Sequence, residues 1–105
     1  MERFILKFLW LEKSIGVALD QKVGEKTTPL NDFKFWPGED SWNITLKYLE
    51  NSVIITEAEK VRLLNTLTDV ITYWQDRDLS KKTWTKKEIF HLQEKFPGCV
   101  FVGFN

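Results

Sequence analysis

Apolar residues alternate with other positions near the start of the chain, which is the pattern of β-strands. Within residues 4–11 every second side chain is large and apolar: Phe4, Leu6, Phe8 and Trp10. The positions between them are also partly apolar, and a strand with two apolar faces is usually central in its sheet. Residues 15–23 alternate in the same way after a short polar turn, so the two segments predict a β-hairpin.

A loop and a short strand, each marked by glycine and proline residues, are predicted after this hairpin. Residues 24–32 contain a glycine and a proline and are predicted to be a loop. Residues 33–36 predict a short strand, which the Pro-Gly pair after it ends. Asp40 or Ser41 can then cap a helix. The buried stripe expected in this helix consists of Trp42, Leu46 and Leu49.

The clearest helical periodicity begins after Thr56. Thr56 and Glu59 form a capping box, in which each side chain satisfies a free backbone N–H group of the other residue. The apolar residues that follow define one wide helix face: Leu63, Leu64, Leu67, Val70, Ile71 and Trp74. A second capping box, Thr85 with Glu88, precedes a shorter helix. Its expected apolar face is Ile89, Leu92 and Phe96.

Residues 99–104 alternate again and predict a last strand. The order of elements is then β-β-β-α-α-α-β, with strands and helices segregated along the chain. This order is typical of an α+β domain with a small, mostly antiparallel sheet and helices packed on one face. The last strand has to return to the sheet, and a place beside the first strand is one option.

The composition is that of one globular domain spanning residues 1–105. Aromatic residues make up 14% of the chain, so a compact core is feasible without disulfides. The single cysteine, Cys99, excludes an intramolecular disulfide and favours a reducing compartment. No apolar run approaches the roughly 20 residues of a membrane helix, so we expect no membrane contact. The patterned sequence starts within the first few residues, so we expect no signal or transit peptide.

Catalytic and metal-binding constellations are not evident in the sequence. His91, the only histidine, falls on the polar face of its predicted helix, where we expect it to be solvated. Cys99 begins the last strand and is expected to be a small buried apolar residue. One His and one Cys make no metal site, and no phosphate-binding glycine motif occurs. We therefore expect a protein without enzyme activity, cofactor, metal or small-molecule substrate.

The one local anomaly in charge is a Lys-rich segment, residues 81–87, within a chain of zero net charge. A tryptophan between lysine pairs can stack on a splayed RNA base while the ammonium groups meet phosphates. The candidate RNA-binding residues are Lys81, Lys82, Trp84, Lys86 and Lys87. The alternative interpretation is a solvated loop that enters a helix, with Trp84 folded onto the core. A weaker candidate patch consists of Arg3, Lys7 and Lys13.

A second cluster is aromatic and lies within residues 33–42. Phe35, Trp36 and Trp42 are candidate contacts for a partner protein, because exposed aromatic residues often anchor such interfaces. The competing interpretation, which is the favoured one, is that these side chains complete the core.

Several stretches, in order along nearly the whole chain, resemble a known family. They are residues 6–12 with 15–21, the Phe-Trp-Pro of 35–37 with 40–42, residues 70–75, and residues 95–103. Together they are similar to the plastid-specific ribosomal protein three family, also called Ycf65-like, with members in cyanobacteria and plastids. Phe-Trp-Pro is commonly followed by a basic residue in that pattern. Here Gly38 and Glu39 follow it, which weakens an RNA role for this loop.

The resemblance implies a non-catalytic structural component of the small (30S) ribosomal subunit that supports assembly or translation. Its implied partners are small-subunit rRNA and neighbouring small-subunit ribosomal proteins. The implied location is the plastid (chloroplast) stroma, or the cytoplasm if the source is a cyanobacterium. Residues with AT-rich codons are abundant, which favours a plastid genome. Two other hypotheses stay open: a free protein-interaction module that regulates translation, and a small enzyme with His91 as its base.

Overall fold

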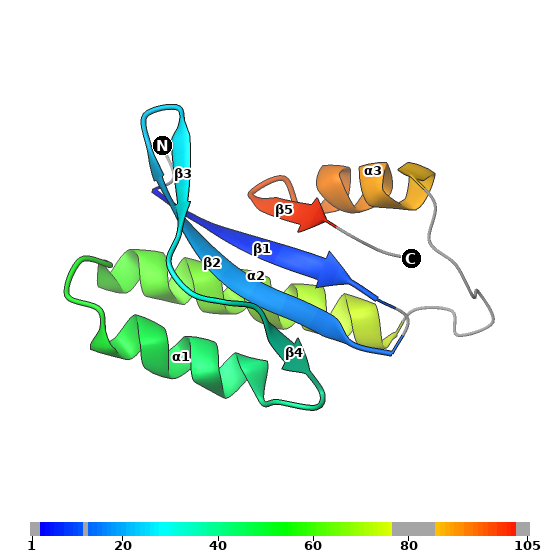
Figure 1. Cartoon of the computed structure of the whole chain (residues 1–105), viewed down its shortest axis with the longest axis horizontal. Coiled ribbons are helices and arrows are strands. Elements are labelled where there is room, and N and C mark those ends of the chain that lie inside the picture. The colour runs from blue at the N-terminus through cyan, green and yellow to red at the C-terminus, as the bar shows by residue number, and fades with distance from the viewer. Residues whose placement is uncertain (1–2, 12, 77–85, 103–105) are drawn as a thin grey trace.

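The computed structural model describes residues 3–11, 13–76 and 86–102, with the backbone alone for residues 86–89. Its elements in chain order are β1 (Phe4–Trp10), β2 (Ile15–Val23), β3 (Lys26–Pro29), β4 (Lys34–Trp36), α1 (Ser41–Asn51), α2 (Glu57–Gln75), α3 (Lys86–Lys95) and β5 (Cys99–Val102). The predicted α+β class is confirmed (Figure 1), with one strand more than the sequence pattern indicated.

The sheet has the strand order β3-β2-β1-β5, and β4 also pairs with β2. β1 and β2 form the predicted antiparallel hairpin, in which Trp10 lies opposite Ile15. β5 returns beside β1 but runs parallel to it, with Leu6 opposite Cys99. The sheet is therefore mixed, and β1 is central, as its two apolar faces predicted. A parallel pair needs a long crossover connection, and the three helices between β4 and β5 provide one.

The prediction of a loop over residues 24–32 is wrong in part, because β3 lies within this segment. Gly24 has a φ of +62°, which glycine adopts readily, and the chain turns there so that Val23 pairs with Lys26. All four residues of β3 are exposed. A strand that buries neither face has no alternation of apolar and polar residues, so periodicity could not reveal it.

The core lies between one face of the sheet and the helices. α1 and α2 lie side by side on that face, and α3 lies beside β5 (Figure 1). The sheet side chains that point into the core are fully buried or nearly so: Phe4, Leu6, Phe8, Trp10, Ile15, Val17 and Leu19. α2 buries five residues of its predicted apolar face, whereas Leu64 is only partly buried. Leu92 of α3 joins the same core.

The predicted stripe of α1 needs a correction. The fully buried positions are Ser41, Thr45 and Leu49, whereas Trp42 and Leu46 are only partly buried. Small hydroxyl residues at the innermost positions let the helix lie close to its neighbours. The Trp42 indole N–H donates a hydrogen bond of 2.8 Å to Thr68 Oγ1, so this ring joins α1 to α2.

The other face of the sheet carries no helix among the described residues. Its side chains from β1 and β5 are partly exposed: Ile5, Lys7, Leu9, Val100 and Val102. Phe33 and Phe35 lie over Gly16 there, since a Cβ atom at Gly16 would be 3.0 Å from Phe35 Cε1 and 3.1 Å from Phe33 Cδ1. We call this surface the open sheet face. No helix within the described part of the chain is long and apolar enough to cross a membrane.

The edge of β5 that faces away from β1 is covered by a side chain. Gln93 of α3 donates from Nε2 to the carbonyl of Cys99 at 3.0 Å, and its Oε1 accepts from the N–H of Phe101 at 2.8 Å. The amide thus satisfies backbone groups that, on an unprotected sheet edge, could pair with a further strand. It also holds α3 against β5.

Candidate functional site

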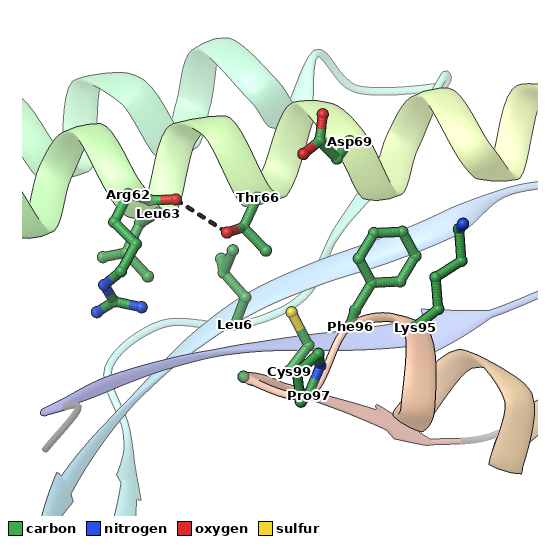
Figure 2. A pocket seen from close by; sticks show the side chains of 10 residues that line it. Leu6, Arg62, Leu63, Thr66, Asp69, Lys95, Phe96, Pro97 and Cys99 are labelled. Carbon is green, nitrogen blue, oxygen red and sulfur yellow. Dashed lines mark hydrogen bonds between the residues drawn. The ribbon is translucent and has the colours of Figure 1, made fainter.

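Two adjoining pockets form a groove between α2 and the turn that joins α3 to β5. The first has a volume of about 280 Å³, and Figure 2 shows side chains of α2 facing those of the turn across it. Its apolar lining includes Leu6, Leu63, Phe96 and Cys99, and its polar lining Arg62, Thr66, Asp69 and Lys95. The second pocket, of about 380 Å³, shares Asp69, Lys95 and Phe96 with the first. We call the pair the α2/α3 groove.

Helical spacing places the polar residues of this groove. Arg62, Thr66 and Asp69 follow one another at intervals of four and three residues, so they share a face of α2 beside its buried stripe. The Thr66 hydroxyl donates a hydrogen bond of 2.9 Å to the carbonyl of Arg62, drawn in Figure 2. The groove therefore has an apolar floor and a polar wall on α2.

Phe96 is held in place by other aromatic rings. Its ring centroid lies 5.8 Å from that of Tyr73, in edge-to-face contact, and 6.2 Å from that of Phe101. Such contacts add stability beyond the burial of area. Phe96 itself stays partly exposed and lines both pockets, so it offers a fixed aromatic surface to a ligand in the groove.

Lys95 brings a positive charge to the same place. Its Nζ lies 5.2 Å from the ring centroid of Tyr73 and 5.9 Å from that of Phe96, which is within cation–π range. No carboxylate of the described residues forms an ion pair with Lys95. The ammonium group therefore stands at the junction of the two pockets without a neutralising partner in this part of the protein.

The candidate RNA-binding residues fall where the structure gives no side chains. Lys81, Lys82 and Trp84 lie outside the described residues, as does the Thr85 of the second predicted capping box. Lys86 and Lys87 begin α3, but only their backbone is described. The role of these five residues, Lys81, Lys82, Trp84, Lys86 and Lys87, stays a prediction.

The weaker basic patch is largely engaged within the chain. Arg3 donates to both carboxylate oxygens of Glu59, at 2.9 Å and 2.6 Å, and also to the carbonyl of Ile54 at 3.0 Å. The Arg3 hydrogen bond, followed by that from the Thr56 N–H, lowers the pKa of Glu59 to about 2. Lys7 Nζ lies 3.4 Å from a carboxylate oxygen of Asp20.

The Arg3–Glu59 pair is built on the capping box of α2, which the sequence predicted and the structure confirms. Glu59 thus satisfies the Thr56 N–H and holds Arg3 at the same time. Two of the three cations of this patch are therefore ion-paired, which leaves little free charge there for RNA phosphates.

The aromatic cluster is divided between the core and the open sheet face. Trp36 and Trp42 are partly buried and pack against the core. Phe35 lies on the open sheet face, where its ring centroid is 6.3 Å from that of Phe33. Of the three candidate protein contacts, Phe35 is the one placed on that face.

The structure gives no support to a catalytic role for His91, which is exposed on α3 and does not line the groove. Cys99 is buried, as predicted, at 3% exposure. Within the described ranges, no group of three or more His, Cys, Asp or Glu side chains is placed to hold a metal ion.

Sequence reasoning missed the α2/α3 groove. The residues that line it come from β1, α2, the end of α3, the α3–β5 turn and the start of β5, and no single stretch of sequence carries them. One signal was present: polar residues Arg62, Thr66 and Asp69 recur beside the apolar face of α2. That signal marks a solvated helix face equally well, because the turn that completes the groove is distant in sequence.

Comparisons with known proteins agree on one family. Residues 30–77 match the family model described as plastid and cyanobacterial ribosomal protein (PSRP-3 / Ycf65). The small ribosomal subunit protein cS23 of Euglena stellata is 52% identical over 105 residues, which cover 100% of both chains. That of Mesostigma viride is 39% identical over 101 residues, covering 96% of this chain and 77% of its own. The probable small ribosomal subunit protein cS23 of a Synechococcus species is 35% identical over 103 residues, 98% of each chain.

Proposed function

The chain belongs to the family of plastid and cyanobacterial ribosomal proteins (PSRP-3 / Ycf65), and we propose that it is a non-catalytic structural component of the small ribosomal subunit. The observation that carries this proposal is the 52% identity, over the full length of both chains, to a protein named for that subunit. The family is one of ribosomal proteins, so the hypothesis of a free regulatory module is not favoured.

The association with the subunit can be tested by affinity purification of a tagged chain from the cells or plastids that make it. The small-subunit rRNA and the small-subunit proteins should be recovered in near-equal molar amounts with the tagged chain. A free interaction module would instead recover them in small, substoichiometric amounts, and that result would contradict the proposal.

The rRNA contact is proposed for the Lys-rich segment: Lys81, Lys82, Trp84, Lys86 and Lys87. Four lysines without an acid between them can neutralise phosphates, and each such contact contributes to the salt dependence of binding. Arg3 and Lys7, two cations of the weaker basic patch, are ion-paired within the chain, which supports this choice over that patch.

Charge reversal tests the binding of rRNA by this segment. Changing its four lysines to glutamate should weaken binding and reduce the slope of log K against log salt by about one for each phosphate that is no longer neutralised. The matched control changes four lysines that belong to neither candidate patch, namely Lys22, Lys26, Lys34 and Lys47. Equally weakened binding in the two variants would show that net charge, and not this segment, governs binding.

Contact with neighbouring ribosomal proteins is proposed for the open sheet face, with Phe35 as its anchor. Its apolar side chains are partly exposed and no described helix covers them. Trp36 of β4 and Trp42 of α1 pack against the core, so they hold these two elements in place and do not contribute to the open sheet face. Phe35→Glu should lower occupancy of the subunit, whereas Val53→Glu, at a position that is 98% exposed in the α1–α2 connection, should not.

The family places the protein in plastids or in cyanobacteria, and we favour the plastid stroma. Relatives from Euglena species are up to 52% identical, compared with 35% for the Synechococcus relative. Immunodetection in fractionated plastids would test the assignment, since a stromal ribosomal protein should sediment with plastid ribosomes.

A further inference from the structure

We infer that the α2/α3 groove binds one unstacked nucleotide of the small-subunit rRNA, with the base against Phe96 and the adjoining phosphate at Lys95. The inference rests on the proposed function, because it takes rRNA as the partner. It adds a site that is separate in sequence from the Lys-rich segment, and it names the part of the RNA that enters.

The size of the groove suits a single base. The first pocket, at about 280 Å³, is slightly smaller than the range of about 300–1,000 Å³ typical of sites for drug-sized ligands. A planar base fills such a space, whereas a helical segment of a partner protein does not enter it. The second pocket continues the groove and shares Asp69, Lys95 and Phe96, so the flanking sugar and phosphate have a path out.

The walls have the chemistry that recognises unpaired bases. Proteins read single-stranded RNA by stacking bases on aromatic rings and bonding to their edges. Phe96 supplies a ring fixed by Tyr73 and Phe101, and the Thr66 hydroxyl and the Asp69 carboxylate stand on the α2 side (Figure 2). A carboxylate accepts hydrogen bonds only, so it favours a base with an exocyclic amino group.

The charges orient the nucleotide. The Lys95 ammonium has no ion-pair partner among the described residues and stands where the two pockets meet, so it can pair with a phosphate. The first pocket has an apolar floor of Leu6, Leu63 and Cys99, which suits the base. Lys95 lines both pockets, so the phosphate is assigned to the rim beside its ammonium group.

Site-specific photo-crosslinking in assembled small subunits tests the inference. A benzophenone amino acid in place of Thr72, an exposed residue that lines the second pocket, leaves the first pocket open and should crosslink to rRNA at one nucleotide, located by a stop in primer extension. The control replaces Val53, exposed in the α1–α2 connection, which should give no crosslink at that nucleotide. A subunit that contains the chain but yields only protein crosslinks from position 72 overturns the inference and leaves the proposed function intact.

Binding measurements provide an independent test. Lys95→Glu loses the pairing with the phosphate, and Thr66→Trp fills the pocket and so loses the base stack. Each variant should bind the small-subunit rRNA about 5- to 150-fold more weakly than the wild-type chain. Lys47→Glu, an exposed charge reversal on α1, is the control and should change binding by less than about threefold. Wild-type affinity in both groove variants would overturn the inference, and absence of the wild-type chain from subunits would overturn the proposed function as well.

Discussion

Replacing Gln93 by leucine should destabilise the protein, because the amide closes the edge of β5. The change removes two hydrogen bonds, to the carbonyl of Cys99 and from the N–H of Phe101. Both residues are buried, at 3% and 5% exposure, so the two backbone groups lose their partner in a poorly solvated place. Leucine and glutamine have similar helix propensities, so α3 itself should be unaffected.

The magnitude follows from those two groups. Leaving a buried donor or acceptor without a partner costs about 1–3 kcal/mol, and the edge position allows some rescue by water. We therefore expect a decrease of about 2 kcal/mol in the free energy of unfolding. The stability of Gln93→Glu should lie between those of the wild type and Gln93→Leu, because its carboxylate still accepts from the N–H of Phe101 but cannot donate to the carbonyl of Cys99.

Urea denaturation, monitored by tryptophan fluorescence, measures these differences in the free energy of unfolding. Gln75→Leu, at an exposed position at the end of α2, is the matched control and should change stability by less than about 0.5 kcal/mol. If Gln93→Leu is no more destabilising than Gln75→Leu, the side chain does not hold β5, and the account of this edge is wrong.

Three further predictions concern pH, steric fit and the core. The pKa of Glu59 is lowered to about 2, chiefly by its hydrogen bond from Arg3. The ionised Glu59 therefore stabilises the fold at pH values above its ordinary pKa of 4.5, and this stabilisation is lost as the pH falls through 2. Glu59→Gln should reduce the decrease in melting temperature between pH 5 and pH 2, and an unchanged pH profile would refute this. Gly16→Ala should cost about 1–3 kcal/mol in urea denaturation because its Cβ would meet the Phe35 ring at 3.0 Å. The cost should shrink in a Phe35→Leu background, and an undiminished cost would show that Phe35 is not the obstacle. Leu67→Ala, at a fully buried position, should cost about 2–5 kcal/mol by calorimetry, and a cost under about 1 kcal/mol would place Leu67 outside the core.

The parts of the fold that the sequence predicted are those with strong local signals. β1 carries large side chains at every second position, and α2 combines a capping box with an uninterrupted apolar face. Burial of one face leaves a period in the sequence, and a side chain that caps a helix leaves a fixed spacing. Both signals act over a few residues, so no knowledge of the distant chain was needed.

The parts that could not be predicted depend on partners distant in sequence or on exposure. β3 is exposed on both faces, so burial imposes no pattern on it. The parallel pairing of β5 with β1 joins segments from opposite ends of the chain, and the hydrogen bonds of Gln93 exist only after that pairing. The α2/α3 groove arises in the same way, because α2 meets the turn before β5 only in the folded chain.

Sedimentation of a cell or plastid lysate through a sucrose gradient, at low salt and then at high salt, tests the central claim most directly. Detection of this chain across the gradient shows whether it travels with the small ribosomal subunit. We predict comigration at near-equal stoichiometry at low salt and release only at high salt, because phosphate contacts are screened as salt rises. A chain that stays at the top of the gradient at low salt would contradict the claim that it is a component of the subunit.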